Sequence, residues 1–188
     1  KLAATSYGGD KAIFGYGDSG SYSTEINLFS NLGVWASTSN ATGTARQSLA
    51  AAPYGGDKGI FGFGEKSASP YYVNITTLVT NTGTVGSETT TVGTARWELA
   101  AAPYGGDKAI FGYGLAGSYL STTNLVSNTG VVANDTAGVG TTRTGLAAAG
   151  YGGDKAIFGY GSNGGTQYSI TNLVSNLGVV ASNTTGVG

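Results

Sequence analysis

The sequence predicts an all-β protein made of four copies of one four-stranded unit, and three observations lead to this. The segment that begins Leu2-Ala-Ala returns at Leu49, Leu99 and Leu146, at spacings of 47, 50 and 47 residues. Glycine accounts for 34 of the 188 residues and recurs at the same places in each unit. No long stretch shows the 3.6-residue apolar period of a helix. Repeats of about 20 to 50 residues are typical of solenoids, propellers and similar arrays.

Each unit is expected to open with a β-hairpin. In the first unit, residues 8–10 read Gly-Gly-Asp, and such glycines supply the positive φ angles that a tight turn requires. In the strand that follows, alternation places Phe14 and Tyr16 on one side of the sheet and Gly15 on the other. The bulky side of one unit can therefore pack against the bare side of its neighbour without leaving voids.

Two shorter strands should complete each unit. In the last unit they are 171–175 and 179–181, and the third unit has its counterpart of the latter at 131–133. The three extra residues of the second unit fall within 65–72, as expected for a surface loop. A unit this small leaves much of its area in water, so it must pack on its neighbours.

Four short strands per repeat are the pattern of propeller blades. We therefore predict one β-propeller domain, 1–188, with four blades of four antiparallel strands. The expected repeat boundaries are about 1–48, 49–98, 99–145 and 146–188.

The repeat resembles the kelch-type β-propeller blade in several positions. Arg46, Arg96 and Arg143 each stand three residues before the leucine that opens the next unit, as the kelch arginine does. The sequence Gly15-Tyr16-Gly17 takes the place of the kelch diglycine, with an aromatic residue inserted between the glycines. Trp35 stands where the kelch tryptophan opens the fourth strand, whereas the other units have valine there. The resemblance implies a divergent kelch-like propeller.

Near-identical repeats of this kind also resemble segments of tail and appendage proteins of tailed bacteriophages. That resemblance implies a virion, extracellular or cell-surface setting and a structural or attachment role.

Composition argues against several classes of function. The formal net charge is −1 and only 10% of residues are charged, so no basic stripe is present to bind nucleic acid. No apolar run is long enough to predict membrane insertion. The chain has no Cys and no His, which removes thiolate and imidazole metal ligands and the residues that the resemblance implies for copper radical oxidases. We predict no metal, no cofactor and no catalytic residue.

The repeated Asp-Lys pair that begins at Asp10 is interpreted as turn chemistry, because a carboxylate beside two glycines caps a turn. The three arginines have two interpretations: hydrogen bonds between blades, or anion binding at a channel mouth, as in sialidase-like hydrolases. Aromatic residues outside the repeat pattern are the better binding candidates, because variable loops can present rings to sugars or proteins. These are Tyr22, Trp35, Tyr71, Tyr72, Trp97, Tyr119 and Tyr168.

The sequence thus favours a non-catalytic structural or attachment module whose partners are proteins or surface glycans. A glycan-binding, lectin-like propeller is the alternative, and a sialidase-like hydrolase is a further one. The four units either close alone or join a larger ring or an oligomer, since propellers have about four to eight blades.

Overall fold

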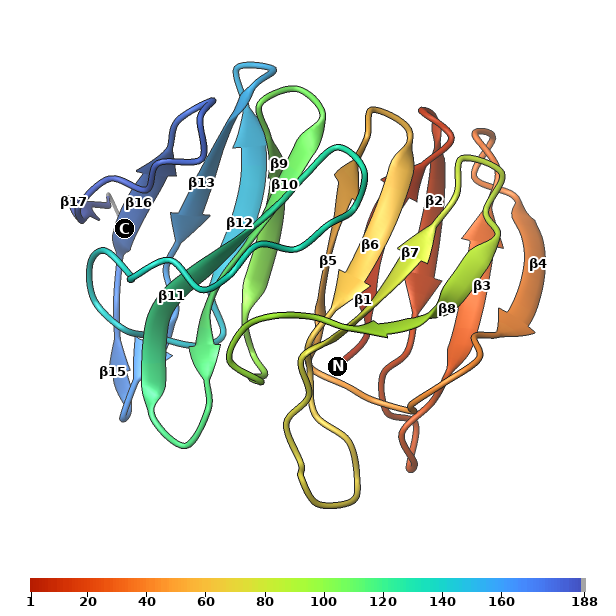
Figure 1. Ribbon diagram of the computed structural model, residues 1–188, viewed down its shortest axis with the longest axis horizontal. Coiled ribbons are helices and arrows are strands. Elements are labelled where there is room, and N and C mark those ends of the chain that lie inside the picture. The colour runs from red at the N-terminus through yellow and green to blue at the C-terminus, as the bar shows by residue number, and fades with distance from the viewer. Residues whose placement is uncertain (187–188) are drawn as a thin grey trace.

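The computed structural model describes residues 1–186 and shows four small antiparallel sheets arranged as a four-bladed β-propeller (Figure 1). Within those residues the chain forms no helix, so the all-β prediction is confirmed. The sheets follow one another in chain order, from red to blue across Figure 1.

The first two blades each have four strands in sequence order across the sheet. The first blade contains β1 (Ala3–Tyr7), β2 (Lys11–Gly15), β3 (Glu25–Phe29) and β4 (Trp35–Asn40). The second contains β5 (Ala50–Tyr54), β6 (Lys58–Gly62), β7 (Ile75–Val79) and β8 (Val85–Thr90). Trp35 opens a fourth strand, as the sequence predicted.

The outer edges of the third and fourth blades are less regular. The third blade contains β9 (Ala100–Tyr104), β10 (Lys108–Leu115) and β11 (Tyr119–Val126). The fourth contains β12 (Ala147–Tyr151), β13 (Lys155–Gly159), β16 (Ile170–Val174) and β17 (Thr184–Thr185), with a small hairpin of β14 (Ser162–Asn163) and β15 (Thr166–Gln167).

The predicted fourth strands at 131–133 and 179–181 are only partly formed. Val132 and Val180 each make a single bridge to the neighbouring strand. An outermost strand has a partner on one side only, and the Asn, Asp, Ala and Gly that follow in the third unit are poor strand formers.

The first strands of the blades, β1, β5, β9 and β12, lie next to one another. Their hairpin turns gather at one end of the molecule, and the loops between second and third strands gather at the other (Figure 1). We call these the turn end and the loop end.

Phenylalanine rings of one blade pack on glycines of the blade before it, as the sequence predicted. Phe61, Phe111 and Phe158 are fully buried. A Cβ added at Gly62 would lie 2.6 Å from Cζ of Phe111, so only glycine leaves room for the ring. Burying a ring of this size stabilises the fold by about 1.5–3 kcal/mol.

Tyr16 lies on the side of the sheet opposite to Phe14, so its predicted placement was wrong. Its φ is +62°, in the left-handed region, and this interrupts the alternation after β2 ends at Gly15. The Tyr16 ring therefore meets Phe61 of the second blade edge-to-face, at 5.4 Å between centroids. Phe63 and Tyr113 repeat this geometry in the next two blades.

Candidate functional site

Each of the three arginines lies between two consecutive blades and is completely buried. Nε of Arg96 donates to the carbonyl of Tyr113 at 2.8 Å, and Nη2 donates to Oδ1 of Asn124 at 2.7 Å. Both acceptors belong to the third blade, whereas the guanidinium lies 4.2 Å from the ring centroid of Phe63 in the second. Arg96 thus joins two blades by hydrogen bonds on one side and a cation–π contact on the other.

Arg143 repeats the arrangement one blade further along, with Tyr160 and Asn172 as acceptors. Arg46 departs from it: Nη1 donates to Glu88 at 2.6 Å and Nη2 to Thr77 at 3.0 Å. Burial lowers the pKa of Arg96 to about 10, which leaves it charged at neutral pH.

Because solvent does not reach the guanidinium groups, the three arginines are not part of an exposed site. Anion binding by Arg46, Arg96 or Arg143 would require the blades to separate. The interpretation as contacts between blades agrees with this placement.

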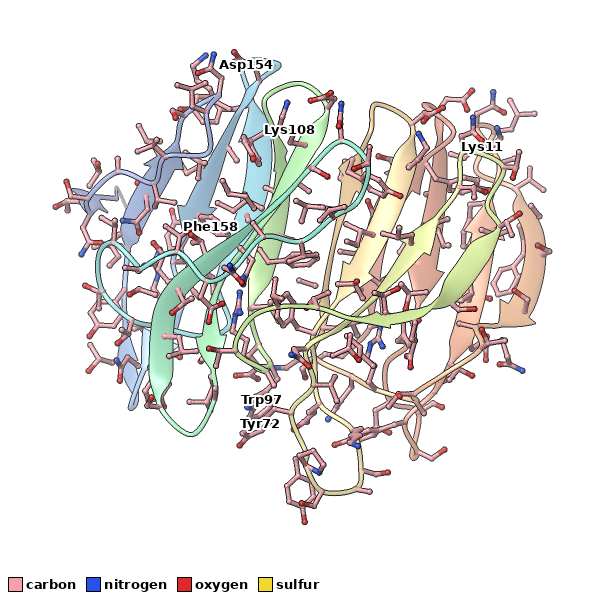
Figure 2. The ribbon with its side chains drawn as sticks, viewed as in Figure 1. Lys11, Tyr72, Trp97, Lys108, Asp154 and Phe158 are labelled. Atoms are coloured by element: carbon pink, nitrogen blue, oxygen red, sulfur yellow. The ribbon has the colours of Figure 1, made fainter. Side chains whose placement is uncertain are left out.

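The Asp-Lys pairs occupy the turn end (Figure 2). Oδ2 of Asp57 accepts a hydrogen bond from the side-chain Nδ2 of Asn81 at 2.9 Å, and Nζ of Lys58 lies 3.4 Å from Oδ1. The Asn81 hydrogen bond is the main cause that holds the pKa of Asp57 below its usual range. The carboxylate therefore ties the first hairpin of a blade to the turn that follows its third strand.

Sequence reasoning missed the asparagine of this contact. Asn31, Asn81 and Asn128 all donate to the aspartate of their own blade, at 2.9–3.0 Å. These asparagines recur at the same position of the repeat, and this recurrence could have identified them from the sequence. No group of three or more Asp or Glu side chains suited to a metal is present among residues 1–186.

The loop end collects most of the aromatic residues that lie outside the repeat pattern. Tyr72 stacks on Trp97, with centroids 6.2 Å apart and planes 9° from parallel, and Figure 2 shows the pair at this end. Tyr71, the residue before Tyr72, is 58% exposed. The hydroxyl of Tyr22 donates to Oε1 of Glu65 at 3.2 Å, and the backbone of Glu65 forms an antiparallel β-bridge with Tyr72.

The third blade continues this row. The backbone of Trp97 forms an antiparallel β-bridge with Leu115, and Leu115 pairs with Tyr119 across the β10–β11 hairpin. We call Tyr22, Tyr71, Tyr72, Trp97 and Tyr119 the loop-end aromatic row. Tyr168 lies in the corresponding loop of the fourth blade, where its amide donates to Gly161. Trp35 lies apart from the row, in contact with Phe29 on the outer side of the first blade.

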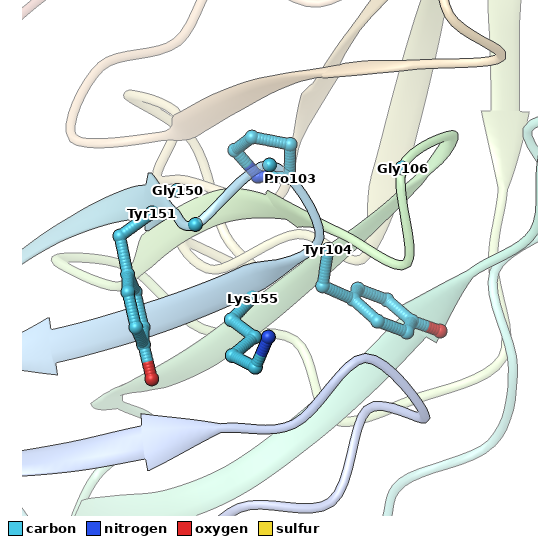
Figure 3. A pocket seen from close by; sticks show the side chains of 8 residues that line it. Pro103, Tyr104, Gly106, Gly150, Tyr151 and Lys155 are labelled. Atoms are coloured by element: carbon cyan, nitrogen blue, oxygen red, sulfur yellow. The ribbon is translucent and has the colours of Figure 1, made fainter.

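A separate hollow of about 470 Å³ lies at the turn end between the third and fourth blades (Figure 3). Its walls include Pro103, Tyr104, Tyr151 and Lys155, together with glycines of both turns. Nζ of Lys155 is 2.7 Å from Asp154, so this amine is held by an ion pair rather than directed at an incoming group. The hollow offers ring faces and backbone groups to a ligand.

These features define a β-propeller-like repeat protein whose repeated residues join the blades. The chain matches no protein-family model, and no curated protein is significantly similar to it in sequence. The kelch-like assignment therefore stays a prediction. Residues 1–186 include no apolar helix of membrane-spanning length.

Proposed function

We propose that this chain is a non-catalytic structural or attachment module, kelch-like in its repeat and carried on a virion or a cell surface. The observation that carries the proposal is the use of the repeated side chains: the arginines and the phenylalanines are buried between blades. Residues held this way rigidify a scaffold. The resemblance of the repeat to phage tail and appendage proteins supports the setting.

A scaffold of this kind tolerates change in its loops. Insertion of four Gly/Ser residues after Ser67, in the exposed part of the 65–72 loop, should leave the melting temperature within about 3 °C of the parent chain, since long surface loops cost little extra entropy. The matched control is the same insertion after Gly56, within the turn between β5 and β6. That turn donates a hydrogen bond to the third blade from Gly55, so this variant should melt at a clearly lower temperature.

Equal loss of stability in both insertions would contradict the scaffold proposal. Any reproducible hydrolysis of sialosides or other glycosides by the purified chain would contradict its non-catalytic part.

Glycan binding is the second candidate, and the loop-end aromatic row favours it. Tyr72 and Trp97 stack with nearly parallel rings, and the preceding residue, Tyr71, exposes its ring to solvent. Ring faces of this kind pack against the C–H faces of sugars, and the hydroxyls can accept and donate hydrogen bonds.

A glycan array tests this candidate. Tyr71→Ala should lower the affinity for any glycan that binds the parent chain by about 10-fold, because one exposed ring is lost while the fold is kept. Leu32→Ala is the control, since Leu32 is exposed in a turn at the opposite end of the molecule. An array with no bound glycan, or an equal loss of glycan binding in both variants, would rule out this candidate and leave the scaffold function as the proposal.

A further inference from the structure

Besides the buried arginines, the interfaces between consecutive blades share three contacts, each formed three times within the chain. The first is a phenylalanine packed on a glycine. Phe61, Phe111 and Phe158 are fully buried this way, but Phe14, their equivalent in the first blade, is 37% exposed. At the other end of the chain, a Cβ added at Gly159 would meet only Thr171, at 3.5 Å. The first blade thus has a free ring, and the fourth has a free glycine.

The second shared contact is a backbone hydrogen bond at the turn end. The amides of Gly8, Gly55 and Gly105 each donate to the carbonyl of the aspartate in the following blade, at 2.6–2.7 Å. Among residues 1–186, the equivalent amide of Gly152 and the equivalent carbonyl of Asp10 have no such partner in another blade. A free donor on the fourth blade therefore matches a free acceptor on the first.

The third shared contact is a tyrosine packed on a turn glycine of the next blade. Rings of Tyr7, Tyr54 and Tyr104 lie 3.0–3.1 Å from a Cβ added at that glycine, and all three tyrosines are buried. Tyr151, the fourth equivalent, is 40% exposed. Gly33, the fourth equivalent of the glycine, has no atom within 4 Å of such a Cβ.

The free halves of the three contacts sort onto two surfaces. The ring face consists of Asp10, Phe14 and Gly33 on the first blade. The glycine face consists of Tyr151, Gly152 and Gly159 on the fourth. The glycine face supplies the partner for each of these three contacts that the ring face leaves free. The arginine that joins consecutive blades has only three copies, Arg46, Arg96 and Arg143, and none of them lies at these two faces.

Both faces are also apolar. On the ring face, Phe29 contacts both Phe14 and Trp35 edge-to-face, with centroids 5.3 Å apart in each of the two pairs. The glycine face has a hollow of about 180 Å³ lined by Ala147, Ala149, Gly159 and Tyr160 among others. Contiguous exposed apolar surface of this kind marks a protein interface.

We propose that a second copy of this chain binds these faces, with the ring face of each copy packed on the glycine face of the other. Phe14 of one copy then fills the hollow over Gly159 of its partner, as Phe158 fills the space over Gly112. Two copies satisfy both pairs of faces at once in a closed ring of eight blades, which is within the range of about four to eight blades found in propellers. A closed ring leaves no face to recruit a third copy.

The mass of the purified chain in solution tests the proposal. Light scattering and sedimentation should give twice 18.7 kDa at micromolar concentration. Phe14→Lys and Gly159→Leu should each weaken association by about 30-fold or more, because each removes one central contact from both interfaces. Tyr71→Lys is the control, since Tyr71 is exposed at the loop end and should leave the dimer intact.

A mixing experiment separates loss of the interface from loss of the fold. The Phe14→Lys chain keeps a native glycine face, and the Gly159→Leu chain keeps a native ring face. Equimolar mixing should therefore restore a dimer through one native interface, whereas either variant alone stays monomeric.

A monomer for the parent chain at every concentration would overturn the proposal. The proposal would also be overturned if each of the two variants still formed a dimer, if their mixture stayed monomeric, or if the parent chain formed a particle of more than two copies.

Discussion

Gly112 offers the sharpest test of how the blades pack. A Cβ at this position would lie 2.7 Å from Cζ of Phe158, with two more ring carbons at 3.0 and 3.2 Å. Carbon atoms pack favourably at about 3.5–4.0 Å, so the ring would have to move by nearly 1 Å. The fully buried Phe158 ring has no such space, because Tyr113 lies against it at 5.2 Å between centroids.

Gly112→Ala should therefore destabilise the chain by about 1–3 kcal/mol, the usual cost of overpacking a core. The loss of unfolded-state entropy from glycine to alanine offsets about 0.4–1 kcal/mol of this. The net effect of about 1–2 kcal/mol corresponds to a melting temperature about 2–8 °C lower for a chain of this length.

Gly159→Ala is the matched control, because the same Cβ there meets only Thr171 at 3.5 Å. It should be neutral or slightly stabilising. Both changes are made in a chain that carries Phe14→Lys, so that association does not contribute, and are compared by urea unfolding and calorimetry. Equal stability of the two variants would refute the packing of rings on glycines.

Three further predictions follow from buried groups. Arg96→Met should cost about 2–4 kcal/mol in urea unfolding, because two buried acceptors lose their donors; Lys66→Met, at a half-exposed loop position, should cost less than about 0.5 kcal/mol. In the same Phe14→Lys background, Tyr54→Ala should cost about 3–5 kcal/mol and Tyr151→Ala much less, since only the first ring is buried; equal costs would refute the difference between covered and free faces. Stability should also fall as pH rises above 10, because burial raises the pKa of Tyr113 and Tyr16 above the unfolded value of 10.0 and the unfolded chain loses those protons first; between about pH 8 and about pH 11, a Tyr113→Phe chain should lose less stability in urea unfolding than the parent, and an equal loss would contradict this.

Much of the architecture could be predicted from the repeat itself. The period fixed the number of units, and the recurring Gly-Gly-Asp fixed the first turn, because positive φ angles at Gly8 and Gly9 are a local requirement. Alternation along β2 was enough to place Phe14 and Gly15 on opposite sides of the sheet.

Less of the candidate site could be predicted from the sequence. The variable aromatic residues could be identified, but the stacking of Tyr72 on Trp97 brings together residues 25 positions apart, one in the loop before β7 and the other in the segment before β9. The partner of each aspartate, such as Asn81 for Asp57, also lies across a sheet rather than nearby in sequence.

The sequence by itself determined the features set by local backbone chemistry: four units, their hairpins, and the pairing of a bulky side with a bare side. The tertiary structure alone decided which groups meet across the blades. A left-handed residue at Tyr16 reverses the side that its ring takes, and burial decides that Arg96 joins two blades instead of facing solvent. The same interactions leave Phe14 and Gly159 without partners, because these contacts form only between one blade and the next.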